Sequence, residues 1–546
     1  MAITRYPYSE ANIAIAEATA QPRQVWINAP NEVVVYTNSD MVASQDIPKR
    51  NSISGCPVVP NAVTTRLNSY FWAFPGGAST ARYGEHHLYV PVGPNNTYWG
   101  SILGVRNRSA YMVPTEQMQG LFVPGLFYLY AACTKSGSWS SSSSAGAMTG
   151  NYGYSNSAGA TVSATINGTR AAAQLYFAVN GGYGIVTVDG STNFSSPLPI
   201  FSSTDYSNGL CRSSDVGKRY ICCYAASQWT HTQLLAEDLS SGTHTVMIEV
   251  CGTKPVASSD YRVYVEAIGG CASTDAVTNA NTYMVPIRTL FEYASPNASA
   301  WVAVPSWAPT GSTDWQFLTN VHADNVNCKE VSVVGPTVTV DGVDRSSPTL
   351  GTWYGGTYVT WYQESTASHK SNLATQVVNR KRTITAMANR PLAIMVDSNF
   401  KWLVDGTINR LYPLMLPTGA YSLIQRSMLP SALSELWLGN GRVGSFSAND
   451  DSLVPIAGGQ QYNAELAHPT IMAILADWLA WGELVYMSPN YDQVYVSNCR
   501  YMLNDRSDGN DKGYFSAVYP CIVPAITGDS IRTIVGFGGG LLADLP

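Results

Sequence analysis

One histidine and a set of tyrosines have the residue types needed to cleave a glycan by elimination. A lyase of this kind uses a histidine–tyrosine pair beside a basic residue that neutralises a uronate. His369 is followed directly by Lys370, and Tyr358, Tyr362 and Tyr412 are the tyrosines that could complete the set. The alternative for His369 is structural: it follows a strand and bonds to a backbone group. A lyase site therefore requires a fold that brings these side chains together.

Six aromatic residues could instead bind a sugar without cleaving it. Aromatic rings stack on the C–H faces of pyranose rings, while Asn, Gln and Asp side chains bond to the sugar hydroxyls. The alternative for each aromatic residue is packing in the core or at a subunit interface. The candidate glycan-binding residues are Trp353, Tyr354, Trp361, Tyr362, Tyr206 and Trp229.

Motifs for other chemistries do not occur in the sequence. There is no GxSxG nucleophile elbow. The glycines at 181–184 lead into a strand-like run and not into a helix, so they do not form a phosphate-binding loop. Asp341 and Asp344 lie in or near a turn, where aspartate favours local hydrogen bonds. Asp450 and Asp451 are interpreted as solvated or cation-bound loop residues, and the sequence predicts no cofactor and no metal centre.

The ten cysteines show no CxxC pair and no metal-like spacing with histidine. Cys222 and Cys223 are adjacent and would point to opposite faces of a strand, so a bond between them is not expected. We interpret most of the cysteines as buried free thiols that act as small hydrophobic residues. Disulfides stay open as an alternative if the protein meets an oxidising medium.

The composition indicates a weakly charged surface. Charged residues make up 12% of the chain, against about 25% in typical proteins. The net charge is −6, and Arg380–Arg382 is the only three-residue basic run, which argues against nucleic acid as the main partner. The 33 tyrosines and 14 tryptophans suit either a sugar-binding face or simply a strand-rich fold.

No targeting segment is predicted. The first 22 residues contain Glu10 and Glu17 where a signal peptide would have an apolar core. The most apolar window, Thr470–Met487, contains Asp477 and Glu483 and falls short of a membrane span. We therefore expect synthesis in a host cytoplasm and no membrane insertion.

Short apolar runs separated by Gly, Pro and Asn predict an all-β protein of serial β-sandwich or jelly-roll domains. The two exceptions are a short N-terminal helical arm and one C-terminal helix at Pro469–Leu484. The Ser/Gly-rich segment at 136–150 predicts a flexible linker or an exposed loop. The predicted domains are a docking arm at 1–22, an N-terminal β domain at 23–150, a jelly roll at 151–275 and a large β-sandwich region at 276–546.

The segment Thr161–Cys271 carries the clearest fold signals. Val186–Gly190 alternates apolar and polar residues and ends in Asp-Gly, a hairpin signal because the turn requires positive φ. His244 then opens a strand with apolar residues on one face, and a Gly-Thr-Lys segment at 252–254 precedes a closing strand. This order resembles the jelly-roll carbohydrate-binding modules of glycan-active enzymes. The resemblance implies that His244 belongs to the framework and not to a catalytic site.

The C-terminal region has its own pattern. It contains a second Asp-Gly hairpin at Asp341–Gly342, a strand followed by His369, and a late Tyr412-x-x-Met-Leu-Pro element. This order resembles a large β-sandwich found in phage tail and fibre proteins and in relatives of polysaccharide lyases. The resemblance implies either a virion part or a glycan-cleaving enzyme.

Together these features predict a structural protein of a bacteriophage-like virion, as a tail fibre, spike or capsid decoration protein. Its predicted partners are other virion proteins and a host cell-surface glycan that serves as receptor. A homo-oligomer is expected, with a homotrimer favoured because trimerisation would cover strand edges. The rival hypothesis is a polysaccharide lyase or glycoside hydrolase (a depolymerase) whose 161–271 module holds the substrate. A plain structural spacer is the third hypothesis, and the sequence favours a protein that is not an enzyme.

Overall fold

The computed structural model describes residues 2–7, 24–28, 32–37, 68–73, 83–92, 96–108, 111–144, 146–225, 228–277, 280–289, 302–318, 329–387, 394–417, 435–438, 441–445, 453–455, 472–475, 478–487, 500–504, 512–516 and 522–541. Strands hold 59% of the described residues and helices 4%, so the prediction of an all-β protein is confirmed. The strands form five antiparallel sheets. Within the described chain, no helix combines the length and apolar character needed to cross a membrane.

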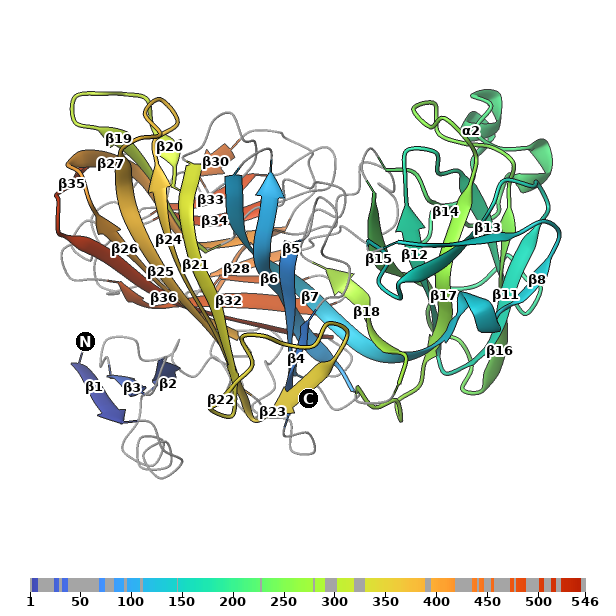
Figure 1. Ribbon diagram of the computed structural model, residues 1–546, viewed down its shortest axis with the longest axis horizontal. Helices are drawn as coiled ribbons and strands as arrows, with labels where there is room; N and C mark the ends of the chain where they lie inside the picture. Colours follow the sequence, from blue (N-terminus) through green and yellow to red (C-terminus); the bar gives the residue numbers. More distant parts are fainter. Residues whose placement is uncertain are drawn as a thin grey trace.

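The largest sheet has eleven strands and joins two parts of the molecule (Figure 1). We call residues 130–277 the module and the rest of the described chain the large body. The last part of β7 pairs with β17 of the module and with β18, while its earlier part pairs with β6. The strands are β4 (Ser69–Ala73), β5 (Tyr83–Pro91), β6 (Tyr98–Arg108), β7 (Tyr111–Leu129), β9 (Ser140–Ser143), β10 (Asn151–Ser155), β12 (Arg170–Phe177), β15 (Trp229–Ala236), β17 (Val263–Cys271), β18 (Thr282–Thr289) and β23 (Trp353–Gly356).

The module encloses one hydrophobic core between two layers of strands. One layer is the end of the eleven-stranded sheet, and the other is a five-stranded sheet. Val186 and Ile248 of the second layer and Leu175 and Val265 of the first are fully buried in this core. Burial of each such side chain contributes about 2 kcal/mol. The five strands are β8 (Thr134–Ser136), β11 (Thr161–Asn167), β13 (Tyr183–Val188), β14 (Tyr220–Cys222) and β16 (Thr243–Val250).

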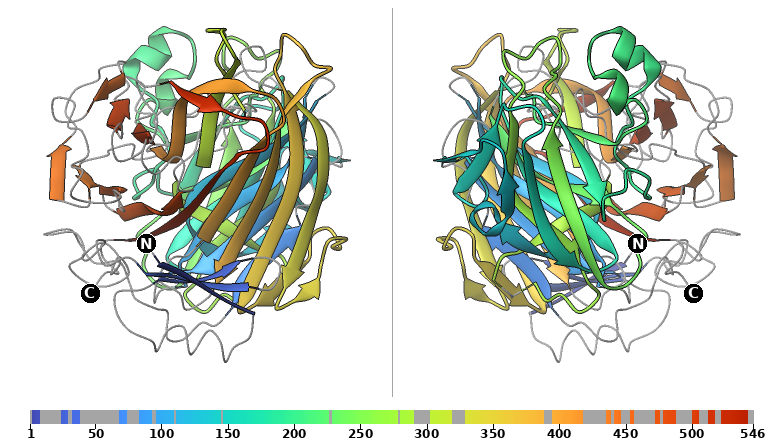
Figure 2. Two further views of the ribbon diagram at one scale, coloured as in Figure 1. Left: turned by 90° about the vertical axis from the view of Figure 1, so that its left-hand side faces the viewer. Right: turned by 90° about the vertical axis from the view of Figure 1, so that its right-hand side faces the viewer.

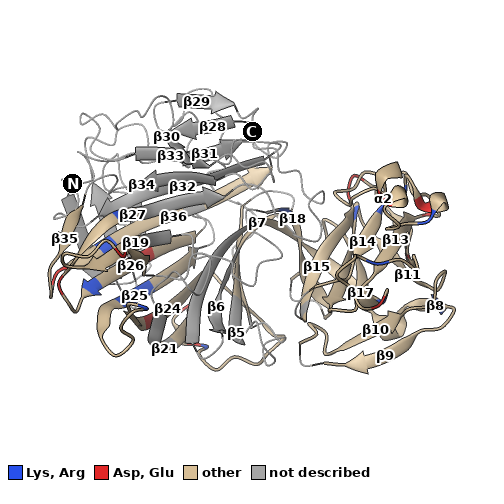
Figure 3. Cartoon of the chain, turned by 90° about the horizontal axis from the view of Figure 1, so that it is seen from above, with Lys and Arg blue, Asp and Glu red and all other residues tan. Residues whose placement is uncertain are grey.

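The large body contains a ten-stranded sheet whose long strands run side by side as a curved layer (Figure 2). Its strands are β21 (Lys329–Val340), β22 (Val343–Asp344), β24 (Tyr358–Ser368), β25 (Gln376–Met387), β26 (Ile394–Trp402), β28 (Glu435–Leu438), β29 (Gly441–Ser445), β31 (Met472–Leu475), β32 (Trp478–Met487) and β36 (Ser530–Leu541). Viewed from above, this body and the module are two separate masses of strands (Figure 3).

Two smaller sheets complete the large body. The seven-stranded sheet comprises β19 (Val302–Pro309), β20 (Gln316–Phe317), β27 (Gly406–Pro417), β30 (Leu453–Pro455), β33 (Arg500–Asn504), β34 (Lys512–Ser516) and β35 (Val523–Ala525). The three-stranded sheet comprises β1 (Ala2–Pro7), β2 (Gln24–Asn28) and β3 (Glu32–Thr37).

Both predicted Asp-Gly turns are present. Asp189 has φ 52° and Gly190 has φ 76°, and Asp341 and Gly342 have φ 49° and 77°. Positive φ at both central residues defines the type I′ turn, whose twist matches that of the flanking strands. In the module hairpin, Val188 and Ser191 exchange two backbone hydrogen bonds.

His244 links the first hairpin to β16, the strand that pairs with β13 in the sheet. On β16 the buried residues alternate with exposed ones, and His244 is 6% exposed on the buried face. Its Nδ1 lies 2.7 Å from Oδ2 of Asp189, and its Nε2 lies 2.8 Å from the carbonyl oxygen of Ser240. The other Asp189 oxygen accepts a hydrogen bond from the backbone N–H of Thr245 at 2.7 Å. The prediction that His244 belongs to the framework is thus confirmed.

Of the two predicted helices, the C-terminal one is wrong where the structure describes it, and the N-terminal one, at residues 9–22, lies outside the described residues. At the N-terminus, Ala2–Pro7 forms β1 and pairs with β3, while residues 8–22 lie outside the described residues. In the predicted C-terminal helix, Met472–Leu475 and Trp478–Met487 form the hairpin strands β31 and β32. An apolar run of this length suits a buried strand as well as a helix, and β32 gains ladder hydrogen bonds to β36.

The Ser/Gly-rich segment predicted as a linker is instead part of the module. Ser140–Ser143 forms β9, which pairs with β10. Ala147 and Met148 follow in a turn and are 1% and 7% exposed. A polar sequence can form a strand when a neighbouring strand offers hydrogen-bond partners, so composition alone misidentified this segment.

The Asp189–His244 contact makes stability depend on pH. The hydrogen bond to Asp189 raises the pKa of His244 above its ordinary value of 6.5. The resulting stabilisation is complete below about pH 6.5 and is lost as the pH rises through the raised pKa. We expect Asp189→Asn, which keeps an acceptor for Thr245, to cost roughly 1 kcal/mol near pH 6 and little near pH 9. Thermal unfolding at the two pH values measures this; an equal loss at both would contradict it.

Candidate functional site

The proposed lyase residues do not converge within the described part of the chain. His369 follows β24 and is 3% exposed. Its Nε2 lies 2.9 Å from the carbonyl oxygen of Asp314, and its Nδ1 lies 2.6 Å from Oγ of Ser371. Tyr362 lies earlier on the same extended strand, roughly 20 Å away along it. The structural alternative for His369, a bond to a backbone group after a strand, is confirmed.

The three tyrosines of the proposed lyase set are not placed beside His369 in the described structure. The Tyr362 hydroxyl donates a hydrogen bond to Glu364, and burial together with this carboxylate raises the pKa of Tyr362. Tyr358 is buried, at 4% exposure. Tyr412 lies on β27 opposite Val304, and its side chain is outside the described residues. None of these positions places a phenol beside His369 in the described structure.

Three of the glycan-binding candidates, Trp353, Tyr354 and Trp361, pack against other side chains of the large body. Trp353 stacks on Trp72 with ring centroids 5.1 Å apart, and its Nε1 donates to the carbonyl oxygen of Thr282 at 3.2 Å. Tyr354 stacks on Phe71 at 5.8 Å. Both side chains are half-buried.

Trp361 has no exposed surface, so its prediction as a sugar platform is corrected. It lies opposite Ile384 of β25, which is also fully buried. The aromatic content of this region therefore serves packing between strands, which was the alternative considered for each residue.

The two module candidates differ. Tyr206 lies on the short helix α2 (Ser203–Ser207) and is 51% exposed. Trp229 is the first residue of β15, and its side chain lies outside the described residues. Among the glycan-binding candidates whose side chains the structure describes, Tyr206 therefore has the most exposed ring.

Tyr206 belongs to a group of three loops at one end of the module, which we call the loop cap. The loop cap comprises residues 178–182, 198–218 and 251–262. The backbone N–H of Ser259 bonds to the carbonyl oxygen of Val179 at 3.1 Å. Thr253 Oγ1 bonds to the carbonyl oxygen of Leu210 at 2.7 Å. These bonds join the three loops, and α2 lies at the end of the module away from the entry of β7 (Figure 1).

A capping box fixes the start of α2. Ser202 Oγ accepts the backbone N–H of Asp205 at 3.1 Å, and Oδ2 of Asp205 accepts the backbone N–H of Ser202 at 2.7 Å. Two donors that the helix would otherwise leave without partners are satisfied in this way. Tyr206 is therefore presented from a defined turn of helix.

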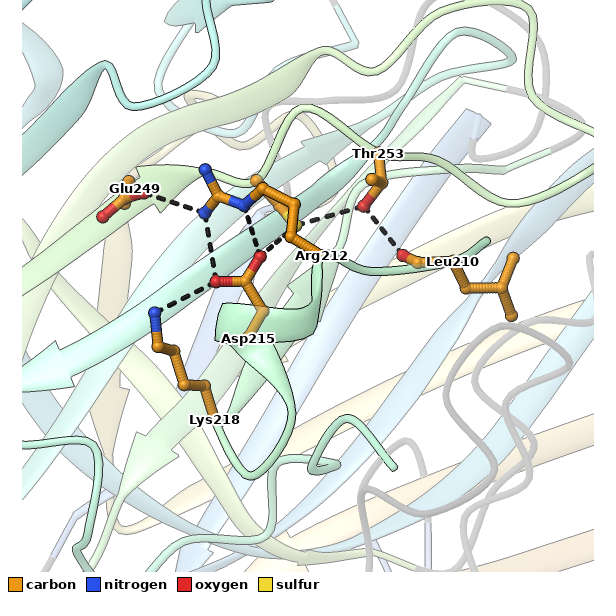
Figure 4. A network of polar contacts seen from close by, with 7 residues as sticks. Leu210, Arg212, Asp215, Lys218, Glu249 and Thr253 are labelled. Carbon is orange, nitrogen blue, oxygen red and sulfur yellow. Dashed lines mark hydrogen bonds and ion pairs between the residues drawn. The ribbon is translucent and has the colours of Figure 1, made fainter. Parts of the chain in front are cut away.

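A buried carboxylate anchors the same loop to the module core (Figure 4). Asp215, at the end of the 3₁₀ helix η3 (Ser213–Asp215), has no exposed surface. Arg212 binds it with two hydrogen bonds of 2.5 and 3.1 Å, and Lys218 adds a third at 3.0 Å. Arg212 also reaches Glu249 of β16 at 3.1 Å.

The charges around Asp215 determine its ionisation. Burial alone would raise the pKa of this carboxyl, but the hydrogen bonds from Arg212 and Lys218 outweigh it and lower the pKa. Cys251 Sγ lies 3.4 Å from Oδ2 of the same carboxylate, and burial raises the pKa of this thiol to about 11. The carboxylate is thus charged and the thiol neutral near pH 7, which makes the network a structural anchor and not a nucleophilic site.

The cysteines of the module confirm the prediction of buried free thiols. Cys133, Cys211, Cys222, Cys223, Cys251 and Cys271 are all buried and unbridged. In the part of the chain that the structure describes, no three His, Cys, Asp or Glu side chains are placed to hold a metal ion.

The surface of the loop cap is polar, aromatic and aliphatic. Around Tyr206, the side chains of Ser203, Thr204, Ser207 and Asn208 are exposed. These groups offer hydroxyls and an amide beside an aromatic ring. Every exposed large hydrophobic side chain described in the module lies in the loop cap; they are Val179, Ile200, Tyr206, Val216 and Val256.

Asp215 escaped the sequence-based prediction, although a signal was present. Arg212, Asp215 and Lys218 are spaced by three residues in a chain that has few charges. Such a cluster in a weakly charged sequence indicates an ion-paired turn. The contact with β16 had no signal in the sequence because it joins positions far apart in the chain.

Comparison with models of protein families finds no match to this chain, and a search of curated proteins finds none.

Removal of the Asp215 charge should loosen the loop cap. Asp215→Asn keeps the shape of the side chain but leaves Arg212 and Lys218 without their buried counter-charge. We expect a loss of roughly 2 kcal/mol in the free energy of unfolding and faster amide exchange at 209–218. Asp238→Asn is the matched control, because this exposed aspartate carries the same charge. It should change stability by about 0.5 kcal/mol or less; equal effects of the two variants would refute the anchor.

Proposed function

We propose that this chain is a structural subunit of a phage-like virion and that the loop cap of its module attaches to a host surface glycan. The observation that carries the proposal is the exposed Tyr206 ring with hydroxyl and amide groups beside it on an anchored loop. Stacking on a pyranose face requires an accessible ring, and hydroxyl recognition requires polar neighbours. The other predicted aromatic platforms with described side chains are half-buried or fully buried.

The architecture supports a structural role. Two bodies of strands share one sheet through β7, so the module is carried on a continuous ladder of backbone hydrogen bonds. Loops at the far end of such a module are well placed to meet a surface. Other virion proteins and further copies of the chain, with a trimer favoured, are the proposed partners in assembly, and the virion is the proposed location.

The depolymerase alternative has no comparable support. Within the described residues, His369 is buried against backbone and Ser371, and Tyr362 is bonded to Glu364. Neither side chain is placed to act on a sugar bond together with the other.

Glycan binding is tested with the full-length protein on an array of bacterial surface glycans. We expect Tyr206→Ala to weaken binding about tenfold, which corresponds to the loss of one ring stacked on a sugar. Tyr128→Ala is the matched control, because Tyr128 is 40% exposed on β7, outside the loop cap. Unchanged binding in Tyr206→Ala, or no glycan retained by the unaltered protein, would overturn the attachment role.

The assembly role has a separate test. Cryo-electron microscopy of purified particles would locate the chain and give its symmetry. Absence of the chain from the particle would refute the virion role even if a glycan binds.

A further inference from the structure

A single carboxyl group lies buried where the module meets the large body. Glu266 is on β17 and has no exposed surface. In the pairing of β17 with β12, Gln174 faces Ala267 and Leu175 faces Val265, so Glu266 is the extra residue of a β-bulge. Bulges redirect a side chain, and here the side chain is a carboxyl in a protein with few charges.

The groups around this carboxyl are neutral. Its Oε2 accepts the backbone N–H of Thr149 at 2.9 Å, and Oγ1 of Thr149 lies 3.3 Å away. Its Oε1 is hydrogen-bonded to the hydroxyl of Thr230. Among the described residues, no lysine or arginine forms an ion pair with it.

The hydrogen-bond count favours the protonated acid. The Thr230 hydroxyl has one proton but two acceptors within reach, Glu266 and the carbonyl oxygen of Leu175 at 3.1 Å. It already accepts a hydrogen bond from Nε2 of Gln174 at 2.7 Å. If Glu266 carries a proton on Oε1, it donates to Thr230, and Thr230 donates to Leu175. If Glu266 is ionised, the single Thr230 proton cannot serve both oxygens at once, and the buried charge lacks a counter-charge.

Two tyrosines on strands of the same sheet interact electrostatically with Glu266. Tyr176 of β12 and Tyr283 of β18 both have a raised pKa, first from burial and further from the Glu266 charge; that of Tyr283 is about 12. His87 of β5 packs edge-on against Trp72 with ring centroids 5.5 Å apart. Burial raises the pKa of Glu266 from 4.5 to about 7, because the hydrogen bonds only partly compensate for it.

Glu266 is connected to the large body through one turn. Thr149, which binds the carboxyl, follows Met148, and Met148 packs in one buried cluster with Trp72 of β4. Trp353 and Tyr283 pack on the same cluster. A change at the carboxyl therefore reaches the contact between the module and the large body through residues 146–150.

We propose that Glu266 acts as a proton-controlled latch: its protonation state determines whether the turn at 146–150 stays packed against the Trp72 cluster. With the carboxyl protonated, the hydrogen-bond network is complete and the turn at 146–150 stays seated against Trp72. Loss of the proton to solvent leaves a buried negative charge, which favours an open state in which the turn leaves the cluster and water reaches the carboxylate. The contact between the turn and the Trp72 cluster is most stable at acidic pH and weakens as the pH rises from about 5 to 7.

Hydrogen exchange of the full-length protein tests the latch. After correction for the intrinsic chemical rate, the opening of residues 146–150 should increase about tenfold per pH unit between roughly pH 5 and 7 and then level off. The slope follows because the open state has an ordinary glutamate pKa and binds fewer protons than the closed state in this window. Glu266→Gln, which keeps the shape and can donate to Thr230, should abolish the slope.

Asp238→Asn is the matched control, because Asp238 is an exposed carboxylate of the same module outside the loop cap and should leave the slope unchanged. A slope that persists in Glu266→Gln, or a flat profile in the unaltered protein, would overturn the latch. If Glu266→Gln does not fold, infrared difference spectra of the unaltered protein test the protonation of Glu266 directly. A buried protonated carboxyl signal that disappears between about pH 6 and 8 supports the latch, and its absence refutes it.

Discussion

The continuity of backbone hydrogen bonds through β7 is the constraint on which the rest of the structure depends. The end of this strand pairs with β17 over Leu126–Leu129, and the strand must also satisfy β6 and β18. The pairing with β7 requires a small residue at Gly269, because a Cβ there would lie 2.5 Å from the Phe127 ring. The packing of β17 on β11 requires another at Gly270, where a Cβ would lie 2.5 Å from the carbonyl oxygen of Asn167. This strand pairing fixes the module on the large body. The buried cluster of Trp72 and Met148 therefore lies at the contact between the two parts.

Two buried carboxyls show how a weakly charged protein uses its few charges. Asp215 and Glu266 both have no exposed surface. Arg212 and Lys218 keep Asp215 ionised and lower its pKa, whereas Glu266 has neutral donors and a pKa raised to about 7. The first group is a permanent anchor for the loop cap, and the second changes charge near neutral pH. Neighbouring charge, and not burial, separates the two roles.

The aromatic residues have a similar division of roles. Trp353, Tyr354 and Trp361 pack against other side chains of the large body, and only part of their surface, or none, is open to solvent. Tyr206 on α2 is 51% exposed, and the proposed attachment role depends on this ring. Abundant aromatic residues in a sequence therefore indicate a strand-rich core as readily as a sugar-binding surface.

Local features followed from the sequence because their causes are local. The Asp-Gly turns at 189–190 and 341–342 need positive φ, and the alternation on β16 places His244 on the buried face. The sequence also indicated, as the alternative for His369, a hydrogen bond to a backbone group after a strand. Glu266 is the one charged residue in the apolar strand Val263–Cys271, but its partners Thr149 and Thr230 lie on two distant segments and could not be predicted from the sequence. Whether 472–487 became a helix or a hairpin, and whether 140–143 became a linker or a strand, was decided by β36 and β10. Strand pairing joins residues distant in sequence, so only the tertiary structure could decide it.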